Sequence, residues 1–369
     1  MKPISDSRKV GPLAAFFIPQ VMQIGMGFLS FQHIVTSYSG NDAWLSTLIA
    51  GLGTLLPMWV ILRLLQNDRS CGQQPDLFSI HHHLFGRHVG NVLSFIIVLH
   101  TFLFAVAFLR GYIEILQVFL FPQLPMIVFS GLFIFIVWYV VMGGIRSIYG
   151  VCLLSFIYLL PLVALTMLAI PNVHLENLLP LFNHRPGQIL TGVYMETHDY
   201  LGFELLIYVF PFIKSPKDAK KWAYFALLAT LYFYMSLMII TSAFFTNGRL
   251  AQMIWPTLTL WKNINFPLIE HVGIVCIVIL LWNLIPNVSL CMWITARFFK
   301  SACPAIKMKY SLLPLLALLV IAVEFIKNGP QVAWVNRLYS NSGFFIVYIY
   351  FPLLLLIQWI KKKIRGKDS

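Results

Sequence analysis

Charged residues are scarce in this chain. Asp, Glu, Lys and Arg make up 11% of the 369 residues, whereas about a quarter of an ordinary soluble domain is charged. Hydrophobic residues account for 59%. The stretch from Val10 to Asn41 has no Asp, Glu, Lys or Arg, and it is longer than the roughly 20 residues needed to cross a bilayer. This composition excludes a soluble core and predicts a polytopic membrane protein.

The sequence also lacks the short motifs of common enzymes and metal sites. Its five cysteines are scattered without a C-x-x-C pair, so neither a disulfide framework nor a zinc site is predicted. No P-loop, nucleophile elbow or H-E-x-x-H motif occurs, so nothing indicates an enzyme or a cofactor. His81, His82, His83 and His88 are close in sequence, but adjacent histidines without fixed geometry are usually solvated, and we predict no metal there.

Charge clusters and Pro/Gly breaks divide the chain into ten predicted membrane helices within one membrane domain, residues 1–369. The basic start is followed by an apolar run that is too long for a signal peptide and has no small-residue cleavage site, so we expect a retained first span. The loops are at most about 20 to 25 residues long, which leaves no room for a separate soluble domain. The predicted spans are 11-36, 43-65, 90-121, 126-143, 148-171, 191-213, 221-246, 268-299, 310-327 and 341-361.

The basic residues are distributed unevenly across this topology. An even number of spans puts both termini on one side, and 20 of the 26 Lys and Arg residues fall on that side. Five lie in the opposite loops, and Arg110 lies inside a span. This positive-inside bias predicts that both termini are cytoplasmic. It also explains the net charge of +13 without a nucleic-acid partner.

The first and sixth predicted spans each contain a weak point. Gln23-Ile24-Gly25-Met26-Gly27 and Tyr200-Leu201-Gly202-Phe203-Glu204 place glycine and polar groups near mid-membrane, at corresponding positions of two five-helix halves. Five spans followed by five more, with the first helix of each half interrupted, is typical of the LeuT-like inverted-repeat fold. The expected fold is therefore an all-α membrane protein of ten helices with helices 1 and 6 broken.

A broken membrane helix exposes backbone N–H and C=O groups, which are tolerated where they line a cavity or meet a ligand. The amides of Gly25 to Gly27 are suited to a ligand carboxylate, and the carbonyls around Gly202 to an ammonium group. The alternative interpretation is close helix packing at small residues. Glu204 is the deepest acid of span six, while Glu196 and Asp199 are expected at the outer interface beside His198.

Two further spans carry polar residues. Arg110 and Glu114 are spaced i,i+4 in span three, and we expect a structural ion pair rather than a proton relay. Asn283 and Asn287 lie one turn apart in span eight around Pro286, and they either face the cavity or hydrogen-bond to neighbouring helices. The candidate ligand-binding residues are Gly25, Met26, Gly27, His100, Phe104, Gly202, Phe203, Glu204, Asn283 and Asn287.

The order and spacing of several short segments resemble one known family. The sequence is similar, nearly end to end, to the B subunit of the spore germination proteins, a branch of the amino acid, polyamine and organocation permease superfamily. The segments that carry the resemblance are Gln23 to Leu29, Asp42-Ala43-Trp44, Phe85 to Gly90, Leu109-Arg110 with Glu114, Gly143 to Arg146, Gly202-Phe203-Glu204 with Tyr208 and Pro211-Phe212, and Phe266-Pro267 with Glu270 and Trp282.

This resemblance implies a LeuT-like fold and a role in sensing nutrients. It implies a germinant receptor in the inner spore membrane or cell membrane, assembled with a larger A subunit and a lipoprotein C subunit. The ligand of such a B subunit is a small nutrient, commonly an amino acid or a sugar. The alternative function is an amino acid permease coupled to protons or sodium ions, because both functions require the same broken helices.

Overall fold

The computed structural model describes residues 5–67, 75–264, 272–303 and 307–365. Within these ranges the secondary structure is helical, apart from one isolated bridge between Val10 and Ile213. The family landmarks Phe266, Pro267 and Glu270 lie outside the described residues.

Helices occupy each of the ten regions in which a span is predicted. Two short helices, α11 (Asn247–Leu250) and α12 (Pro256–Lys262), follow α10. The helices in the ten regions are α1 (Ala14–Gln23) and α2 (Phe31–Ser39); α3 (Ala43–Gly53) and α4 (Leu55–Asn67); α5 (Leu77–Phe119); α6 (Met126–Met142); α7 (Gly144–Met167); α8 (Pro186–Thr197) and α9 (Leu206–Val209); α10 (Pro216–Phe244); α13 (Val272–Ala302); α14 (Met308–Phe325); and α15 (Gly329–Phe344) and α16 (Phe351–Arg365).

Length and hydropathy identify this chain as an integral membrane protein. In the described residues, seven helical segments are long and apolar enough to cross a bilayer. Two further helical stretches, Met126–Met142 and Phe203–Phe212, are apolar but shorter. The seven segments are Phe31–Asn67, Leu77–Phe119, Gly144–Asn172, Pro216–Phe244, Val272–Ala302, Met308–Phe325 and Gly329–Ile364.

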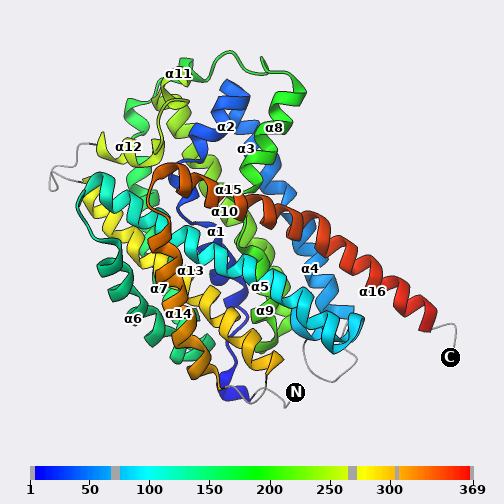
Figure 1. Cartoon of the computed structure of the whole chain (residues 1–369). Helices are drawn as coiled ribbons and strands as arrows, with labels where there is room; N and C mark the ends of the chain where they lie inside the picture. The colour runs from blue at the N-terminus through cyan, green and yellow to red at the C-terminus, as the bar shows by residue number, and fades with distance from the viewer. Residues whose placement is uncertain (1–4, 68–74, 265–271, 304–306, 366–369) are drawn as a thin grey trace.

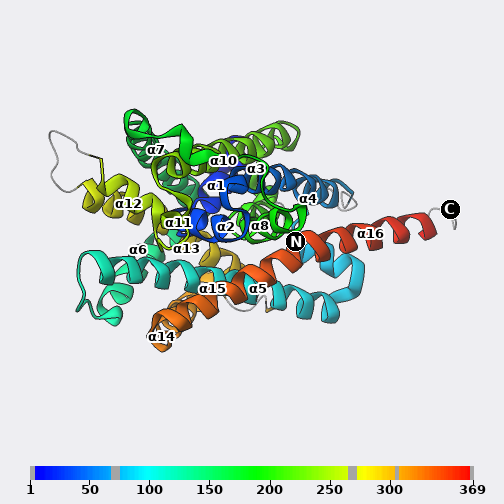
Figure 2. The ribbon, with the colours of Figure 1, turned by 90° about the horizontal axis from the view of Figure 1, so that it is seen from above.

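Helix α1 is the most central element of the bundle. Figure 2 shows it between α10 and α13, and it packs against α10, α7 and α13. Ala14, Ala15, Ile18 and Val21 are completely buried because neighbours surround α1 on several sides. By contrast, α16 extends away from the bundle in both views (Figure 1, Figure 2) and packs against α4. Any interruption of α1 therefore lies at the centre of the molecule.

Helix α5 begins with a short segment that folds back on its main part. Gly86 has φ 78°, a left-handed conformation that favours glycine, and Gly90 packs against the backbone of His81 and His82. His81 is buried, with Nδ1 2.8 Å from Ser94 Oγ and Nε2 2.7 Å from the Tyr350 hydroxyl. The expectation that His81 is solvated was therefore wrong, because its ring joins α5 to the chain before α16.

Candidate functional site

The first membrane helix is interrupted at the centre of the bundle. Helix α1 ends at Gln23, Ile24 has a non-helical backbone (φ −86°, ψ 80°), and the regular helix resumes at Phe31 after a short 3₁₀ turn, Gly27–Leu29. Backbone groups that would be paired inside a continuous helix are therefore freed in this segment. In a membrane protein such groups need partners from side chains or a ligand.

The sixth predicted helix is interrupted opposite this segment. Helix α8 ends at Thr197, and a 3₁₀ turn, Phe203–Leu205, leads into α9. Between them Gly202 has φ +116°, and a Cβ at this position would lie 2.5 Å from the carbonyl oxygen of Met22. Both the positive φ and the contact require glycine, because any side chain would strike the backbone of α1.

Side-chain hydrogen bonds tie the two breaks together. Gln23 Nε2 donates to the carbonyl of Tyr200 at 2.8 Å. The hydroxyl of Tyr234, from α10, lies 3.1 Å from both the Gln23 and the Asp199 carbonyl oxygens. Asn283 Nδ2, from α13, donates to the carbonyl of Ile24. The breaks are thus held face to face by side chains that replace the lost helical hydrogen bonds.

A cluster of aromatic rings covers the break at Gly25. The Phe108 ring lies so close that a Cβ added at Gly25 would collide with its far edge. Phe108 packs edge-on against Phe104, with ring centroids 4.1 Å apart. Phe104 and His100 both stack on Tyr339 of α15, at 4.9 and 5.2 Å. Phe104 is therefore connected to the break through Phe108, and His100 is connected to Phe104 through Tyr339.

Several buried polar atoms near this centre have no protein partner among the described residues. Gly202 N donates to Glu204 Oε2 at 2.7 Å, but Glu204 Oε1 is left without a partner. Buried polar groups are normally hydrogen-bonded, so each exception needs an explanation. The unpartnered atoms are Glu204 Oε1, His100 Nε2, Asn287 Oδ1, Tyr208 OH and Tyr348 OH.

The two asparagines of α13 have different partners. Asn283 accepts a hydrogen bond from Ser155 Oγ at 2.9 Å and donates to the first break, so it makes an interhelical contact at the site. Asn287 Nδ2 donates to the carbonyl of Asn283 at 2.8 Å within α13. Its Oδ1 remains available for another donor. Among the other candidates, Phe203 is buried and Met26 is half-buried.

Glu196 is buried inside the helical bundle. Helix α8 packs against α2 and α3, and this buries Glu196 completely. Asp199 is half-buried, and its carboxylate lies against Gly27, because a Cβ at Gly27 would collide with Oδ1. The end of α8 therefore places these two acids against neighbouring helices and the first break.

Arg110 is buried, but its hydrogen bonds do not go to Glu114. Nε donates to the carbonyl of Ile326 at 2.6 Å, and Nη2 lies 3.5 Å from that of Lys327. Both carbonyls follow the last turn of α14, so the guanidinium caps that helix. Glu114 and Glu324 act on Arg110 through their charges. In the described structure, the expected pair is therefore a longer-range interaction rather than a direct contact.

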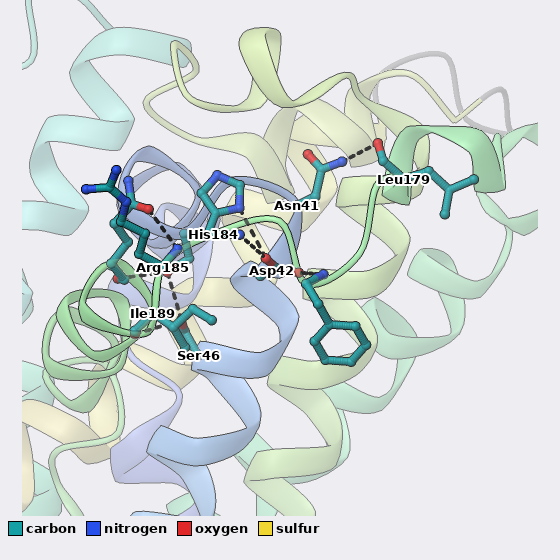
Figure 3. Close-up of polar contacts among 10 residues, drawn as sticks. Asn41, Asp42, Ser46, Leu179, His184, Arg185 and Ile189 are labelled. Carbon is teal, nitrogen blue, oxygen red and sulfur yellow. Dashed lines mark hydrogen bonds and ion pairs between the residues drawn. The ribbon is translucent and has the colours of Figure 1, made fainter.

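At the end of the bundle opposite the N-terminus, Asp42 anchors the loop before α8 (Figure 1, Figure 3). Its carboxylate accepts hydrogen bonds from the backbone N–H groups of Phe182 and His184, and His184 Nδ1 lies 3.2 Å from it. Nearby, Asn41 Nδ2 donates to the carbonyl of Leu179, and Ser46 Oγ donates to that of Ile189 at 3.0 Å. We call the contacts of Asp42 with Phe182 and His184 the outer clasp.

Sequence reasoning missed three residues of the site: Phe108, Tyr234 and Tyr339. Phe108 and Tyr234 lie in apolar helices, a pattern that usually indicates core packing, and Tyr339 lies just before the predicted tenth span. A hydroxyl within an apolar span, as at Tyr234, was the available signal, because a buried Tyr O–H usually finds a partner.

Comparison with solved structures assigns the chain to a class of membrane proteins: it has the LeuT-type transporter fold. A Na⁺-coupled sialic acid symporter superimposes with a TM-score of 0.65 at 10% identity, covering 93% of this chain and 80% of that one. MhsT, solved in complex with L-phenylalanine, gives 0.62 at 16% identity, covering 95% and 88%. At these identities the similarity establishes the fold alone.

Sequence comparison then identifies the family. Residues 9–332 match the family model described as spore germination protein, Spore_permease. The chain is 32% identical to spore germination protein GerQB of Bacillus cereus over 365 residues, which cover 99% of this chain and 100% of that protein. It is 24% identical to spore germination protein KB of Bacillus subtilis (strain 168) over 353 residues, 90% of each. The chain belongs to the spore germination protein family, as a permease-like B-type membrane subunit rather than an enzyme.

Proposed function

We propose that this chain senses a small nutrient as the membrane subunit of a germinant receptor. The nutrient, an amino acid or a sugar, binds between the breaks at Gly25-Met26-Gly27 and Gly202-Phe203-Glu204. An A subunit and a lipoprotein C subunit, the partners that the family resemblance implies, receive the signal. Occupied and empty states differ in how the two breaks are arranged, and the ligand favours the state that it binds better.

One observation carries this proposal: two broken helices face each other at the centre of the bundle. Tyr234 and Gln23 connect them. Unpartnered polar atoms lie in the second break, at Glu204, and on two neighbouring helices, at His100 and Asn287. In LeuT-type proteins, half-helix ends and unwound backbone meet the substrate near the midplane. A polar nutrient would supply hydrogen-bond partners to such groups.

Substitution at Gly25 tests the ligand site. Gly25→Val adds a β-branched side chain against the Phe108 ring and narrows the space between the breaks. The far edge of a phenylalanine can move, so we expect the variant to accumulate in the membrane with its partners while the response to the nutrient is lost. Germination assays and immunoblots of the variant measure the two effects separately.

Three results at Gly25 lead to different conclusions. Loss of the response with normal accumulation supports the site. Loss of the protein itself would indicate helix packing. An unchanged response with unchanged nutrient sensitivity would remove Gly25 from the site. A thermal-shift screen of the purified chain against amino acids and sugars identifies the ligand, because a ligand of the folded state raises its stability by mass action.

The proposal includes ten spans with both termini in the cytoplasm, which follows from the positive-inside bias. Single cysteines at Lys217, before the main part of α10, and at Asn183, beside His184 in the outer clasp, test it. Both positions are exposed. A membrane-impermeant reagent should label them from opposite sides, and labelling of both from one side would contradict ten spans.

The second candidate is a secondary transporter, because the chain shares its fold with a Na⁺-coupled symporter. Purified chain in liposomes separates the two functions. Uptake of a nutrient that also raises the thermal midpoint would establish transport. Binding without uptake would support sensing.

A further inference from the structure

Two acidic side chains lie one helical turn apart where α8 ends. The N–H of Asp199 donates to the carbonyl of Glu196 at 3.0 Å, so the two residues share one turn. Glu196 has 0% of its surface exposed, and Asp199 places its carboxylate against Gly27 of the first break. The pair therefore connects the end of α8 to the interrupted part of the first span.

Among the residues that the structure describes, no counter-charge pairs with these two acids. Neither carboxylate forms an ion pair with a described Lys, Arg or His, and the charged group that acts on Glu196 is the like-charged Asp199. Both carboxylate oxygens of Glu196 are buried without a hydrogen-bond partner among the described residues. The ring of His198 lies edge-on against Tyr194 and Phe344. A buried carboxylate without a partner, beside a second acid, must either take up a proton or bind a cation.

The surroundings of the pair are rich in oxygen. Gln23 donates through Nε2 to the carbonyl of Tyr200, next to Asp199, and its own Oε1 is buried without a partner. The Tyr234 hydroxyl also contacts the carbonyl of Asp199. Carboxylate, amide and carbonyl oxygens suit hard cations. Within the described ranges no three His, Cys, Asp or Glu side chains come together, which favours a monovalent ion over zinc or calcium.

We propose that Glu196 and Asp199 form a binding site for one monovalent cation, either Na⁺ or the ammonium group of an amine. The bound cation neutralises the pair and joins α8 to the break at Gly27. This inference goes beyond nutrient sensing and does not depend on which nutrient the receptor recognises.

The test is the thermal midpoint of the purified full-length chain in detergent, in NaCl, methylammonium chloride or choline chloride at equal ionic strength. Na⁺ or methylammonium should raise the midpoint by roughly 5 °C at about 100 times its Kd, whereas the bulky choline should not. A midpoint raised by NaCl identifies the bound cation as Na⁺, and a midpoint raised by methylammonium chloride identifies it as an amine. Glu196→Gln and Asp199→Asn should abolish the rise, and Glu176→Gln, an exposed loop acid, should retain it.

The amide variants keep the shape of the side chains and remove like-charge repulsion. Their midpoints in choline chloride should therefore equal or exceed that of the unmodified chain, which verifies that they are folded. If neither Na⁺ nor methylammonium raises the midpoint of the unmodified chain, protons neutralise the pair and the inference is wrong. A rise that persists in both amide variants also overturns it. Nutrients tested in the same assay at fixed NaCl report separately on the proposed function.

Discussion

Asp42 and Glu196 are both acids with 0% of their surface exposed, yet their surroundings differ completely. In the outer clasp, Asp42 accepts hydrogen bonds from two backbone N–H groups, and His184 Nδ1 lies beside it. At the helix breaks, both oxygens of Glu196 lack a partner among the described residues. Burial alone therefore does not distinguish these two acids, whereas their hydrogen bonds do.

The physical reason is the cost of burying charge. A buried carboxylate that accepts backbone hydrogen bonds is stabilised in its charged form and fixes the loop that donates them. One without partners is unfavourable unless something else binds there. We therefore expect residues of the outer clasp to contribute mainly to stability and side chains of the helix breaks mainly to binding.

Gly202→Val should have the largest effect, because Gly202 combines a positive φ with a close contact to the backbone of α1. Valine disfavours φ +116°, and its Cβ would press on the carbonyl of Met22. Strain and overpacking together should destabilise the fold by about 4 kcal/mol. Size-exclusion profiles of the solubilised protein measure the loss. Gly131→Val in α6, where a Cβ meets nothing within 4 Å, is the matched control, and equal losses in both variants would refute a special role for Gly202.

Arg110→Met should have the next largest effect, because this buried guanidinium donates to two backbone carbonyls. The change leaves the carbonyls beyond α14 without their donor and should lower the free energy of unfolding by about 3 kcal/mol. Glu114→Gln should lower it by less than about 1 kcal/mol, because Glu114 acts only through its charge. SDS-unfolding titrations compare the two. Equal losses of stability in Arg110→Met and Glu114→Gln would instead support the direct ion pair expected from the i,i+4 spacing.

Acid-to-amide substitution at both sites tests the comparison directly. Asp42→Asn replaces one accepting oxygen with an amide that cannot accept the N–H bonds of the clasp, and should destabilise the protein by about 2 kcal/mol. Glu196→Gln removes a charge that has no partner and should not lower stability in cation-free buffer. The thermal midpoint should therefore fall in Asp42→Asn and should not fall in Glu196→Gln. A similar decrease in both would mean that Glu196 is a structural acid.

Sequence predicted the location of the breaks better than the partners of the polar residues. Gly25, Gly27 and Gly202 mark interruptions because glycine and polar groups weaken an apolar helix locally. The partners of Arg110 lie more than 200 residues further along the chain, and no local pattern specifies them. The facing of Glu196 likewise depends on how α8 packs against α2 and α3. Tertiary contacts, rather than local propensity, decide which polar groups are satisfied.

Tyr234→Phe should produce the smallest change in stability and sharpen the comparison within the helix breaks themselves. Its hydroxyl lies 3.1 Å from the carbonyls of both Gln23 and Asp199, so a single group bridges the two interrupted helices. Phenylalanine preserves the ring contact with Phe31 at 4.8 Å and removes only these hydrogen bonds. A loss of about 1 kcal/mol is expected, because a neutral hydrogen bond contributes roughly that amount.

If the Tyr234 bridge also sets the distance between the breaks, the nutrient concentration for half-maximal germination should shift while the thermal midpoint falls only slightly. A matched Tyr232→Phe change on the exposed face of α10 should alter neither quantity. Unchanged nutrient sensitivity in Tyr234→Phe would show that the bridge has no part in recognition.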